Sequence, residues 1–453
     1  MSRTESASAR MAAFVADLNL GAVPDDVERL ARLHMADAVG VALAAAAVPA
    51  HRDMVRTLRQ QSPHAGPASL LGFDDRAPSD IAALINGTSM HSLEYDDTHM
   101  GAIVHGSAVI VPTVLAIAQE QGLRLSDAVR LTIAGWELLV RLGEAAPGGF
   151  QRRGFQVTSA GGAIVAALLA AQARGQSIAT MTHAAGIAGS QASGIFAFLS
   201  NGSNVKALHP GWAAHAAIWA STLAGSGMTG PAAVLEDKYG VFAAYADDRN
   251  AGDRLHTTLD GLGTRWALRE AAFKFYPCCH YIHPYLEAAE HLREQAAGAP
   301  IVAVHCRVAP GAALVIAEPW SVKQQPRDNN EAKYSLPYTV ACALLGIPID
   351  VPAMTVAPLD DAALTLAKRV TTERWDDSGF PQKFGAVLDV TLADGRVLQA
   401  RIAQVMGSVE RPASEQRIQA KFLANAARSV TEAEALKRWD AFLTSDEVAS
   451  AMA

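Results

Sequence analysis

The hydrophobic pattern of this 453-residue chain changes once, near residue 268, and this change constrains the fold more than any other feature. From Ser6 to about Arg265, Ala and Leu dominate and apolar residues recur three and four positions apart, as in "VERLARLHMADAVGVALAAA". This spacing is typical of amphipathic helices. Further on, "IVAVHCRVAP" and "AVLDVTLADGRVLQARIAQV" alternate with a period of two, and Ala-Asp-Gly at 393–395 supplies a hairpin turn. We therefore expect a mainly α fold, with an antiparallel sheet in its later part.

The chain is too long for one ordinary core, and its pattern suggests where it divides. Between the expected strands, "NNEAKYSLPYTVACALLG" and "LDDAALTLAKRV" are expected to be helices, so residues 268–404 should form an α+β unit. The tail from Ser414 has a helical pattern again and is expected to pack on the first part. We predict one helical domain from 1–267 with 405–453 and one smaller domain from 268–404.

Composition and missing motifs exclude several classes of protein. Half of the residues are hydrophobic, and the formal charge of −7 is spread without a basic run, so nucleic acid is not an expected partner. The N-terminal "MSRTESASARMAAFVADLNLG" indicates an amphipathic helix, and the most apolar stretch, "AVGVALAAAAVPA", is too short to cross a bilayer. Four cysteines that include a vicinal pair favour a reducing compartment, so we expect a cytoplasmic protein without membrane contact. Phosphate-loop, dinucleotide, nucleophile-elbow and zincin motifs are absent, which leaves side-chain acid/base chemistry.

The stretch "HSLEYDDTHMGAIVHG" at 91–106 holds three histidines and three carboxylates. If 81–98 is a helix, His91, Glu94 and Thr98 share one face of it. A solvated surface helix would show the same polarity, but apolar runs on both sides favour polar groups that turn inward and find partners. A metal site is the alternative, although the spacing matches no common ligand motif. The groups expected to turn inward are His91, Glu94, Asp96, Asp97 and His105.

A second stretch, "NGSNVKALHPGWAAHAAIWA" at 201–220, places Lys206 before an Ala-rich helix that starts around His209. The free N–H groups of a helix start and a nearby lysine can bind an anion, so a carboxylate ligand is expected here. A solvated lysine in a connecting loop is the simpler alternative.

A third stretch, "FKFYPCCHYIHPYLEA" at 273–288, gathers Lys274, Cys279, His280 and His283. Zinc ligation and a thiol nucleophile are two hypotheses, but adjacent cysteines rarely bind one ion and no second cysteine pair completes a zinc site. A third hypothesis makes Lys274 a cation and one histidine a general acid or base. Buried small cysteines in a capped loop are the structural alternative.

Taken together, the stretches resemble the MmgE/PrpD family, which includes 2-methylcitrate dehydratases, cis-aconitate decarboxylases and iminodisuccinate epimerases. "NGTSMHSLEYDDTH" is similar to its N-G-x-x-x-H-x-x-D-[FY]-D-D-T segment, and "VHGSAVIVPTVLAIAQ" to H-P-S-x-x-V-L-P-A-x-L-A-x-A-E. "GFQVTSAGGAIVAALLAA", "VKALHPGWAAHAAIWASTLAGSGMTGP" and "KFYPCCHYIHPYLEA" resemble the segments that follow. "EAKYSLPYTVACALL" and "SVERPASEQRIQAKF" fit the last ones, so the resemblance covers nearly the whole chain.

The resemblance implies a large helical domain made from both chain ends, a smaller α+β lid domain, an active site in the cleft and a homodimer. It also implies a reaction on a small di- or tricarboxylic acid without metal or cofactor. The catalytic residues that we predict are His105, Asp97, Asp96, Lys206, Lys274 and His280. The predicted substrate-binding residues are Glu94, Thr98, Gln156, His209, Cys279 and His283.

Four positions depart from the family pattern. Glu94 stands where Asp is usual, Gln156 and Cys279 stand where histidines occur in cis-aconitate decarboxylases, and Gly106 replaces a proline. An amide cannot carry protons at neutral pH, and a thiol does so differently from an imidazole. We therefore predict a dehydratase-type lyase, with an epimerase of a dicarboxylate such as iminodisuccinate or a decarboxylase as alternatives. A carboxylate-binding protein without turnover and a metal-dependent hydrolase are the alternatives outside this family.

Overall fold

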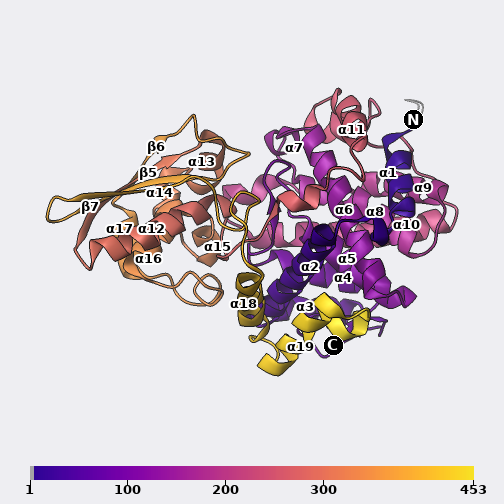
Figure 1. The fold of residues 1–453 in the computed structure, drawn as a ribbon, viewed down its shortest axis with the longest axis horizontal. Coiled ribbons are helices and arrows are strands. Elements are labelled where there is room, and N and C mark those ends of the chain that lie inside the picture. Colours follow the sequence, from indigo (N-terminus) through magenta and orange to yellow (C-terminus); the bar gives the residue numbers. More distant parts are fainter. Residues whose placement is uncertain (1–4, 453) are drawn as a thin grey trace.

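The computed structural model describes residues 5–452 and shows a large helical lobe beside a smaller lobe that contains a sheet (Figure 1). Residues 1–4, where the N-terminal stretch begins, lie outside the described residues. One hydrophobic core gathers side chains from residues 7–273 and 418–452, and a second gathers side chains from residues 278–400. The predicted mainly helical fold is confirmed, with 58% of the residues in helices. The domain limits at 267/268 and 404/405 stay a prediction.

The helices of the large lobe come from both ends of the chain. They are α1 (Ala7–Asp17), α2 (Asp25–Ala46), α3 (Pro49–Gln61), α4 (Ser79–His91), α5 (Ser107–Gln121), α6 (Leu125–Ala145), α7 (Gly149–Arg152), α8 (Val157–Ala173), α9 (Ile178–Gln191), α10 (Leu208–Gly225), α11 (Ala251–Leu259), α18 (Glu415–Ala426), α19 (Glu432–Thr444) and α20 (Val448–Met452). The tail helices α18 and α19 pack on α2, as the sequence suggested.

Helix α8 lies at the centre of this lobe, in contact with α5, α6, α9 and α10. Its sequence is apolar on all sides, and residues 157–171 are buried, which is what a fully surrounded helix requires. Serine hydroxyls cap the N-termini of two helices in this lobe. Ser177 Oγ accepts from Thr180 N at the start of α9, and Ser414 Oγ accepts from Arg417 N at the start of α18.

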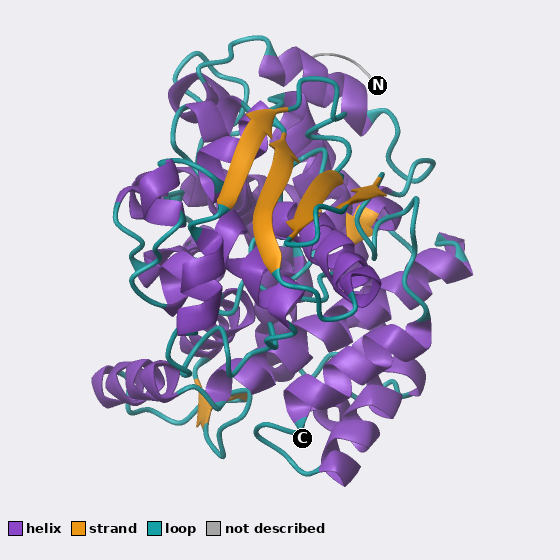
Figure 2. Ribbon diagram, turned by 90° about the vertical axis from the view of Figure 1, so that its left-hand side faces the viewer, coloured by secondary structure: helices purple, strands orange, loops and turns teal. Residues whose placement is uncertain are grey.

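The smaller lobe is built on a four-stranded sheet of order β6-β5-β7-β8, which faces the viewer in Figure 2. Its elements are β5 (Ile301–Val308), β6 (Val370–Arg374), β7 (Ala386–Leu392), β8 (Val397–Ile402), α12 (His283–Ala296), α13 (Pro310–Ile316), α14 (Trp320–Lys323), α15 (Asn329–Ala332), α16 (Leu336–Leu345) and α17 (Asp361–Ala367). Helix α12 packs on β7 and β8 and also contacts α16. The predicted hairpin is confirmed as β7 and β8, joined around Asp394.

Three expectations about this lobe were wrong in part. The sheet is mixed, because β6 pairs parallel to β5. The stretch expected as one helix at 359–370 ends at Ala367, and the chain then enters β6 after a helical crossover, the connection that parallel strands need. The stretch at 329–346 forms two helices that break at Ser335, whose Oγ caps α16 by accepting from Tyr338 N.

The helix expected over 81–98 was also wrong in its extent. Helix α4 ends at His91, Glu94 adopts a left-handed backbone conformation with φ of 54°, and Thr98 lies in β3 (Thr98–His99). A local bond from His91 Nδ1 to the Asp96 carboxylate competes with helical continuation. Strand β3 pairs with β4 (Ala271–Ala272), so Thr98 lies opposite Ala272, two residues before Lys274.

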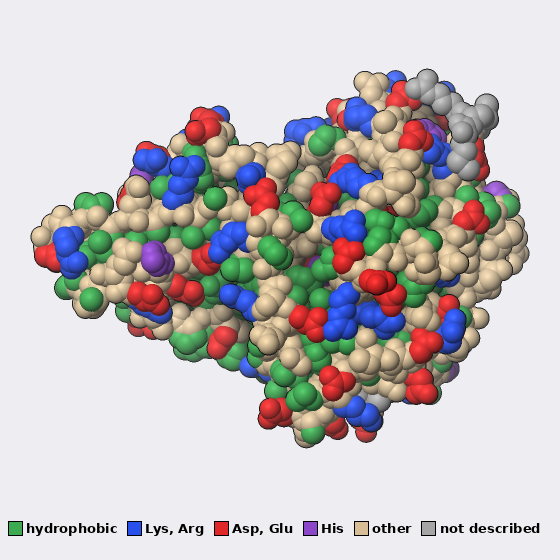
Figure 3. Space-filling view, in the orientation of Figure 1, with side chains coloured by type: hydrophobic (Ala, Val, Ile, Leu, Met, Phe, Trp, Pro, Cys, Tyr) green, Lys and Arg blue, Asp and Glu red, His purple; other side chains and the backbone are tan. Residues whose placement is uncertain are grey.

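A short hairpin of β1 (Ala68–Ser69) and β2 (Arg76–Ala77) completes the strands. No single described helix is long and apolar enough to cross a membrane, while the bent pair α2 and α3 passes by length and composition only. Acidic and basic side chains are interspersed on the face shown in Figure 3, where no broad basic patch is visible.

A close helix crossing in the large lobe joins α4 to α10 through two glycines. A Cβ atom on Gly211 would lie 2.4 Å from both Leu84 O and Thr88 Oγ1, and one on Gly87 would lie 2.8 Å from the Gly211 Cα. Both contacts are too short for a side chain. The crossing therefore needs glycine on both helices, and it holds the start of α10 against the end of α4.

We predict that Gly211→Ala lowers the free energy of unfolding by about 1–3 kcal/mol, because the new methyl group overpacks the crossing. Urea denaturation measures the change. Gly21→Ala is the control, since its Cβ would meet nothing closer than 3.5 Å. Equal stability of the two variants would contradict the tight crossing.

Candidate active site

The polar stretches meet between the two cores. The loop after α4 brings Glu94 and Asp96, the turn before α10 brings Lys206, and the segment after β4 brings Lys274. Pairing of β3 with β4 places Thr98 and Lys274 on neighbouring segments. Residues far apart in the sequence thus share one buried region.

Glu94 lies at the centre of this region with only 5% of its surface exposed. Lys206 Nζ donates to both carboxylate oxygens at 2.6 and 2.7 Å, and the Tyr334 hydroxyl donates to Oε1 at 2.6 Å. Lys274 Nζ lies 3.8 Å from Oε2 and donates to the Glu94 backbone carbonyl at 3.1 Å. Burial acts to raise the pKa of Glu94, but the charges of Lys206 and Lys274 hold this pKa well below its ordinary value.

Lys333 and Tyr334 belong to the same cluster, and our prediction from sequence missed both. Lys333 is buried and donates to the Ser92 backbone carbonyl at 3.2 Å. Burial lowers the pKa of Lys333 to about 8, with the Glu94 charge acting against this shift. Burial also raises the pKa of Tyr334 well above its ordinary value, and the Glu94 charge adds to the effect. The one signal was the Lys-Tyr pair inside a stretch that we used only to predict a helix and for its family resemblance.

His105 presents a neutral imidazole to this cluster. Its Nδ1 donates to the Asp97 backbone carbonyl at 2.9 Å, lies 3.3 Å from Thr98 Oγ1 and lies 3.6 Å from Asp96 Oδ2. Since Nδ1 carries the proton in this assignment, Nε2 keeps its lone pair. Burial lowers the pKa of His105 to about 3, the Asp96 charge opposes this, and Lys274 and Lys206 add to it. At neutral pH, the His105 imidazole is therefore unprotonated.

A chain of hydrogen bonds runs from Asp96 to His209 through His91 and Gln156. His91 Nδ1 donates to Asp96 Oδ2 at 2.7 Å, the Gln156 amide nitrogen donates to His91 Nε2 at 3.2 Å, and His209 Nδ1 donates to Gln156 Oε1 at 2.7 Å. Burial acts to raise the pKa of Asp96, but His91 and His105 hold it below its ordinary value. Gln156 thus fixes the orientation of two imidazoles and carries no proton itself.

Asp97 turns its carboxylate away from the lysines. Its Oδ2 accepts from His34 Nδ1 at 2.8 Å, and its Oδ1 accepts from the backbone N–H of Ser107 at the start of α5, at 3.2 Å. The His34 ring stacks on Phe273 at 4.0 Å. Asp97 therefore orients His105 through its backbone carbonyl, and its side chain supports the loop.

His280 and His283 differ in their surroundings. His283 Nε2 bonds the Cys278 carbonyl at 3.3 Å, and its ring meets the edge of Tyr276. Neither ring nitrogen of His280 has a hydrogen-bond partner within residues 5–452, and its ring lies edge-on to His283 and Phe384. Burial lowers the pKa of His280 well below its ordinary value, and the charge of Lys274 adds to this effect. Of these two histidines, His280 is therefore the one free to meet a ligand.

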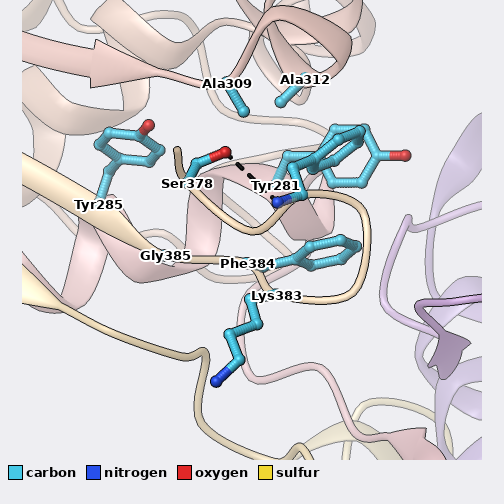
Figure 4. Close-up of a pocket in the computed structure, with 9 residues that line it drawn as sticks. Tyr281, Tyr285, Ala309, Ala312, Ser378, Lys383, Phe384 and Gly385 are labelled. Atoms are coloured by element: carbon cyan, nitrogen blue, oxygen red, sulfur yellow. Dashed lines mark hydrogen bonds between the residues drawn. The ribbon is translucent and has the colours of Figure 1, made fainter. Parts of the chain in front are cut away.

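Behind His280, Phe384 belongs to an aromatic wall with Tyr281 and Phe380. Figure 4 shows the small pocket that these side chains line, with Ser378 bonded to the backbone beside it. Its volume is about 10 Å³, which is at most the room for one water. The wall supports His280 and does not bind a substrate.

The thiol and metal hypotheses fit the contacts poorly. Burial raises the pKa of Cys278 and of Cys279, so both thiols are protonated and weak nucleophiles. No cysteine belongs to any group of potential metal ligands within the described chain. In one such group His91 already uses both ring nitrogens. In the other, His99 Nδ1 accepts from Ala102 N, so its Nε2 carries the proton that faces Glu270.

Two family models together match most of the chain. The model of the MmgE/PrpD N-terminal domain matches residues 9–253, and the model of the MmgE/PrpD C-terminal domain matches residues 276–447. A cis-aconitate decarboxylase of Aspergillus terreus is 29% identical over 280 residues, which cover 60% of this chain and 57% of that protein. The chain thus spans less than two thirds of that relative.

Two other relatives match over more of their length. The cis-aconitate decarboxylase-like protein oryM of Aspergillus oryzae is 25% identical over 95% of this chain and 92% of its own. The cis-aconitate decarboxylase of Mus musculus is 25% identical over 94% of this chain and 87% of its own.

We predict that His209 makes the protein less stable in acid. Burial lowers the pKa of His209 to about 4. Between about pH 6.5 and pH 4, His209 is therefore protonated in the unfolded chain but not in the folded chain. The free energy of unfolding then falls as the pH falls, by about 2 kcal/mol from pH 8 to pH 5 for this one group. His209→Asn keeps a donor for Gln156 and should flatten the pH dependence, as measured by urea denaturation at both pH values. An unchanged slope would contradict the assignment.

Proposed function

The chain belongs to the MmgE/PrpD family, and on that premise we propose that it is a lyase that removes a proton beside a carboxylate of a small di- or tricarboxylic acid. The observation that carries the proposal is the position of His105, a neutral imidazole, beside the partly buried Lys206 and the buried Lys274. Cations hold the carboxylates of the substrate and stabilise the negative charge that forms on carbon. The imidazole accepts the proton.

A dehydration is the first candidate reaction. His105 Nε2 takes the proton from carbon, the electron pair forms the double bond, and the hydroxyl group leaves from the neighbouring carbon. The proton then held on His105 is available to the leaving hydroxide, so water departs and one imidazole serves both halves of the reaction. Lys274 binds a substrate carboxylate, Lys206 and the Tyr334 hydroxyl hold the Glu94 carboxylate beside it, and Thr98 contributes a further hydroxyl. No cofactor takes part in this proposal.

The protonation state of the imidazoles suits a reaction that begins with removal of a proton. Burial lowers the pKa values of His105 and His209 to about 3 and 4, so both imidazoles are unprotonated at neutral pH. Decarboxylation ends with a proton delivered to carbon, and Lys333, with its pKa of about 8, is one candidate donor for that step. The names of the relatives make decarboxylation of a tricarboxylate the second candidate. Epimerisation of a dicarboxylate is the third, since it needs the same proton abstraction. A cytoplasmic homodimer remains our expectation.

Removing the lysines tests the anion-binding part of the proposal. We predict that Lys206→Ala and Lys274→Ala each lower kcat/KM by about 10- to 1,000-fold. Lys274→Ala removes a buried cation that faces substrate charge, and Lys206→Ala leaves the Glu94 carboxylate without its main cation, so that this carboxylate repels the substrate. Lys383→Ala is the control, since Lys383 pairs with Glu410 at the surface. A near-normal kcat/KM in both lysine variants would contradict the assignment of these lysines to carboxylate binding.

Replacing His105 tests the proton-transfer part. His105→Asn keeps a donor for the Asp97 carbonyl but removes the basic Nε2, so we predict loss of turnover with carboxylate binding still measurable by calorimetry. A kcat of the His105→Asn variant within tenfold of the wild-type value would indicate that His280 or His209 is the base instead.

A further inference from the structure

We infer that Glu94 determines substrate specificity, because its own carboxylate fills a carboxylate-binding position between Lys206 and Tyr334. Ligands with two carboxylates are thereby favoured over ligands with three. The inference rests on the proposed function, because both place a carboxylate ligand in this cleft. It adds the class of that ligand.

The contacts of Glu94 are those expected of a bound substrate carboxylate. Lys206 Nζ bridges both oxygens at 2.6 and 2.7 Å, and the Tyr334 hydroxyl donates at 2.6 Å. Charge-assisted bonds of this length are the strong ones in proteins. An incoming carboxylate gains no such donors here while Glu94 holds them.

The backbone around Glu94 is anchored so that this carboxylate stays in place. Lys333 donates to the carbonyl of Ser92, Lys274 to that of Glu94 and Lys421 to that of Tyr95, at 3.2, 3.1 and 2.9 Å. Glu94 itself adopts a left-handed conformation that is uncommon for residues other than glycine. Three lysines on three separate segments therefore hold the loop, and the position of the Glu94 side chain does not depend on one flexible contact.

The charges of the cluster give the same result. Lys206, Lys274 and Lys333 face two carboxylates of the protein, those of Glu94 and Asp96. The lysines exceed these carboxylates by one positive charge, so each carboxylate that a ligand adds beyond the first is compensated less well, and a third carboxylate is disfavoured most. Replacing Glu94 by a neutral residue frees Lys206 for the ligand.

A pocket lies beside this position. It has a volume of about 410 Å³ and is lined by loop residues such as Asn201 and Ser203 and by smaller-lobe residues such as Val322 and Lys323. Tyr334 also lines it, and the Tyr334 ring centroid lies 5.4 Å from Lys206 Nζ and 5.8 Å from Lys323 Nζ. The pocket and the Glu94 carboxylate therefore share Tyr334 as a neighbour.

The test is calorimetric titration of the full chain with malate and maleate, which carry two carboxylates, and with citrate and cis-aconitate, which carry three. Wild-type protein should bind the dicarboxylates at least tenfold more tightly. Glu94→Gln should change the ratio of affinities by at least tenfold in favour of the tricarboxylates. Glu94→Asp keeps the charge but withdraws it by about 1.5 Å, one carbon–carbon bond, and should shift the ratio in the same direction. This second variant serves if the first does not fold.

Glu415→Gln is the matched control, because it removes a carboxylate that pairs with Arg29 on the surface. Its ratio of affinities should equal that of wild type. An unchanged ratio in folded Glu94→Gln and Glu94→Asp, with carboxylates still bound, overturns the inference and leaves the proposed function standing. Failure of every protein to bind any carboxylate overturns both.

Discussion

The buried ion cluster around Glu94 is the interaction on which the rest of the site depends. It joins the loop after α4, the turn before α10, the segment after β4 and the link between α15 and α16, through Lys206, Lys274 and Tyr334. Lys274 has none of its surface exposed, and burying such charges without partners is costly. Each segment therefore supplies charges or donors that the others need, and the two lobes are held together at this point.

This cluster also sets the chemistry of its neighbours. Lys206 and Lys274 add to the effect of burial on His105 and keep its imidazole neutral. The Asp97 carbonyl fixes the tautomer, while the chain through His91 and Gln156 fixes His209. The result is a set of cations beside a base, an arrangement that suits proton removal from carbon next to a carboxylate.

The spacing of apolar residues along the chain predicted much of the fold, because helices and hairpins each impose a regular spacing over a short segment. The hairpin around Asp394 and the tail helix from Ser414 needed no long-range information. The end of α4 at His91, the parallel strand β6 and the break at Ser335 depend on contacts with distant residues, which periodicity does not record. For the site, clustered titratable residues pointed to Glu94, His105, Lys206 and Lys274. Lys333 and Tyr334 were missed, because each acts only through partners about 240 residues away.

The central claim is that this cluster and His105 together remove a proton from carbon beside a carboxylate. Proton NMR of a panel of di- and tricarboxylic acids in deuterium oxide measures this step directly. We expect at least one acid either to exchange its carbon-bound proton for deuterium or to lose water and give an alkene signal. The wild-type protein should catalyse this reaction far faster than the His105→Asn variant. Rapid formation of itaconate from cis-aconitate, without proton exchange or dehydration of any other acid, would contradict it.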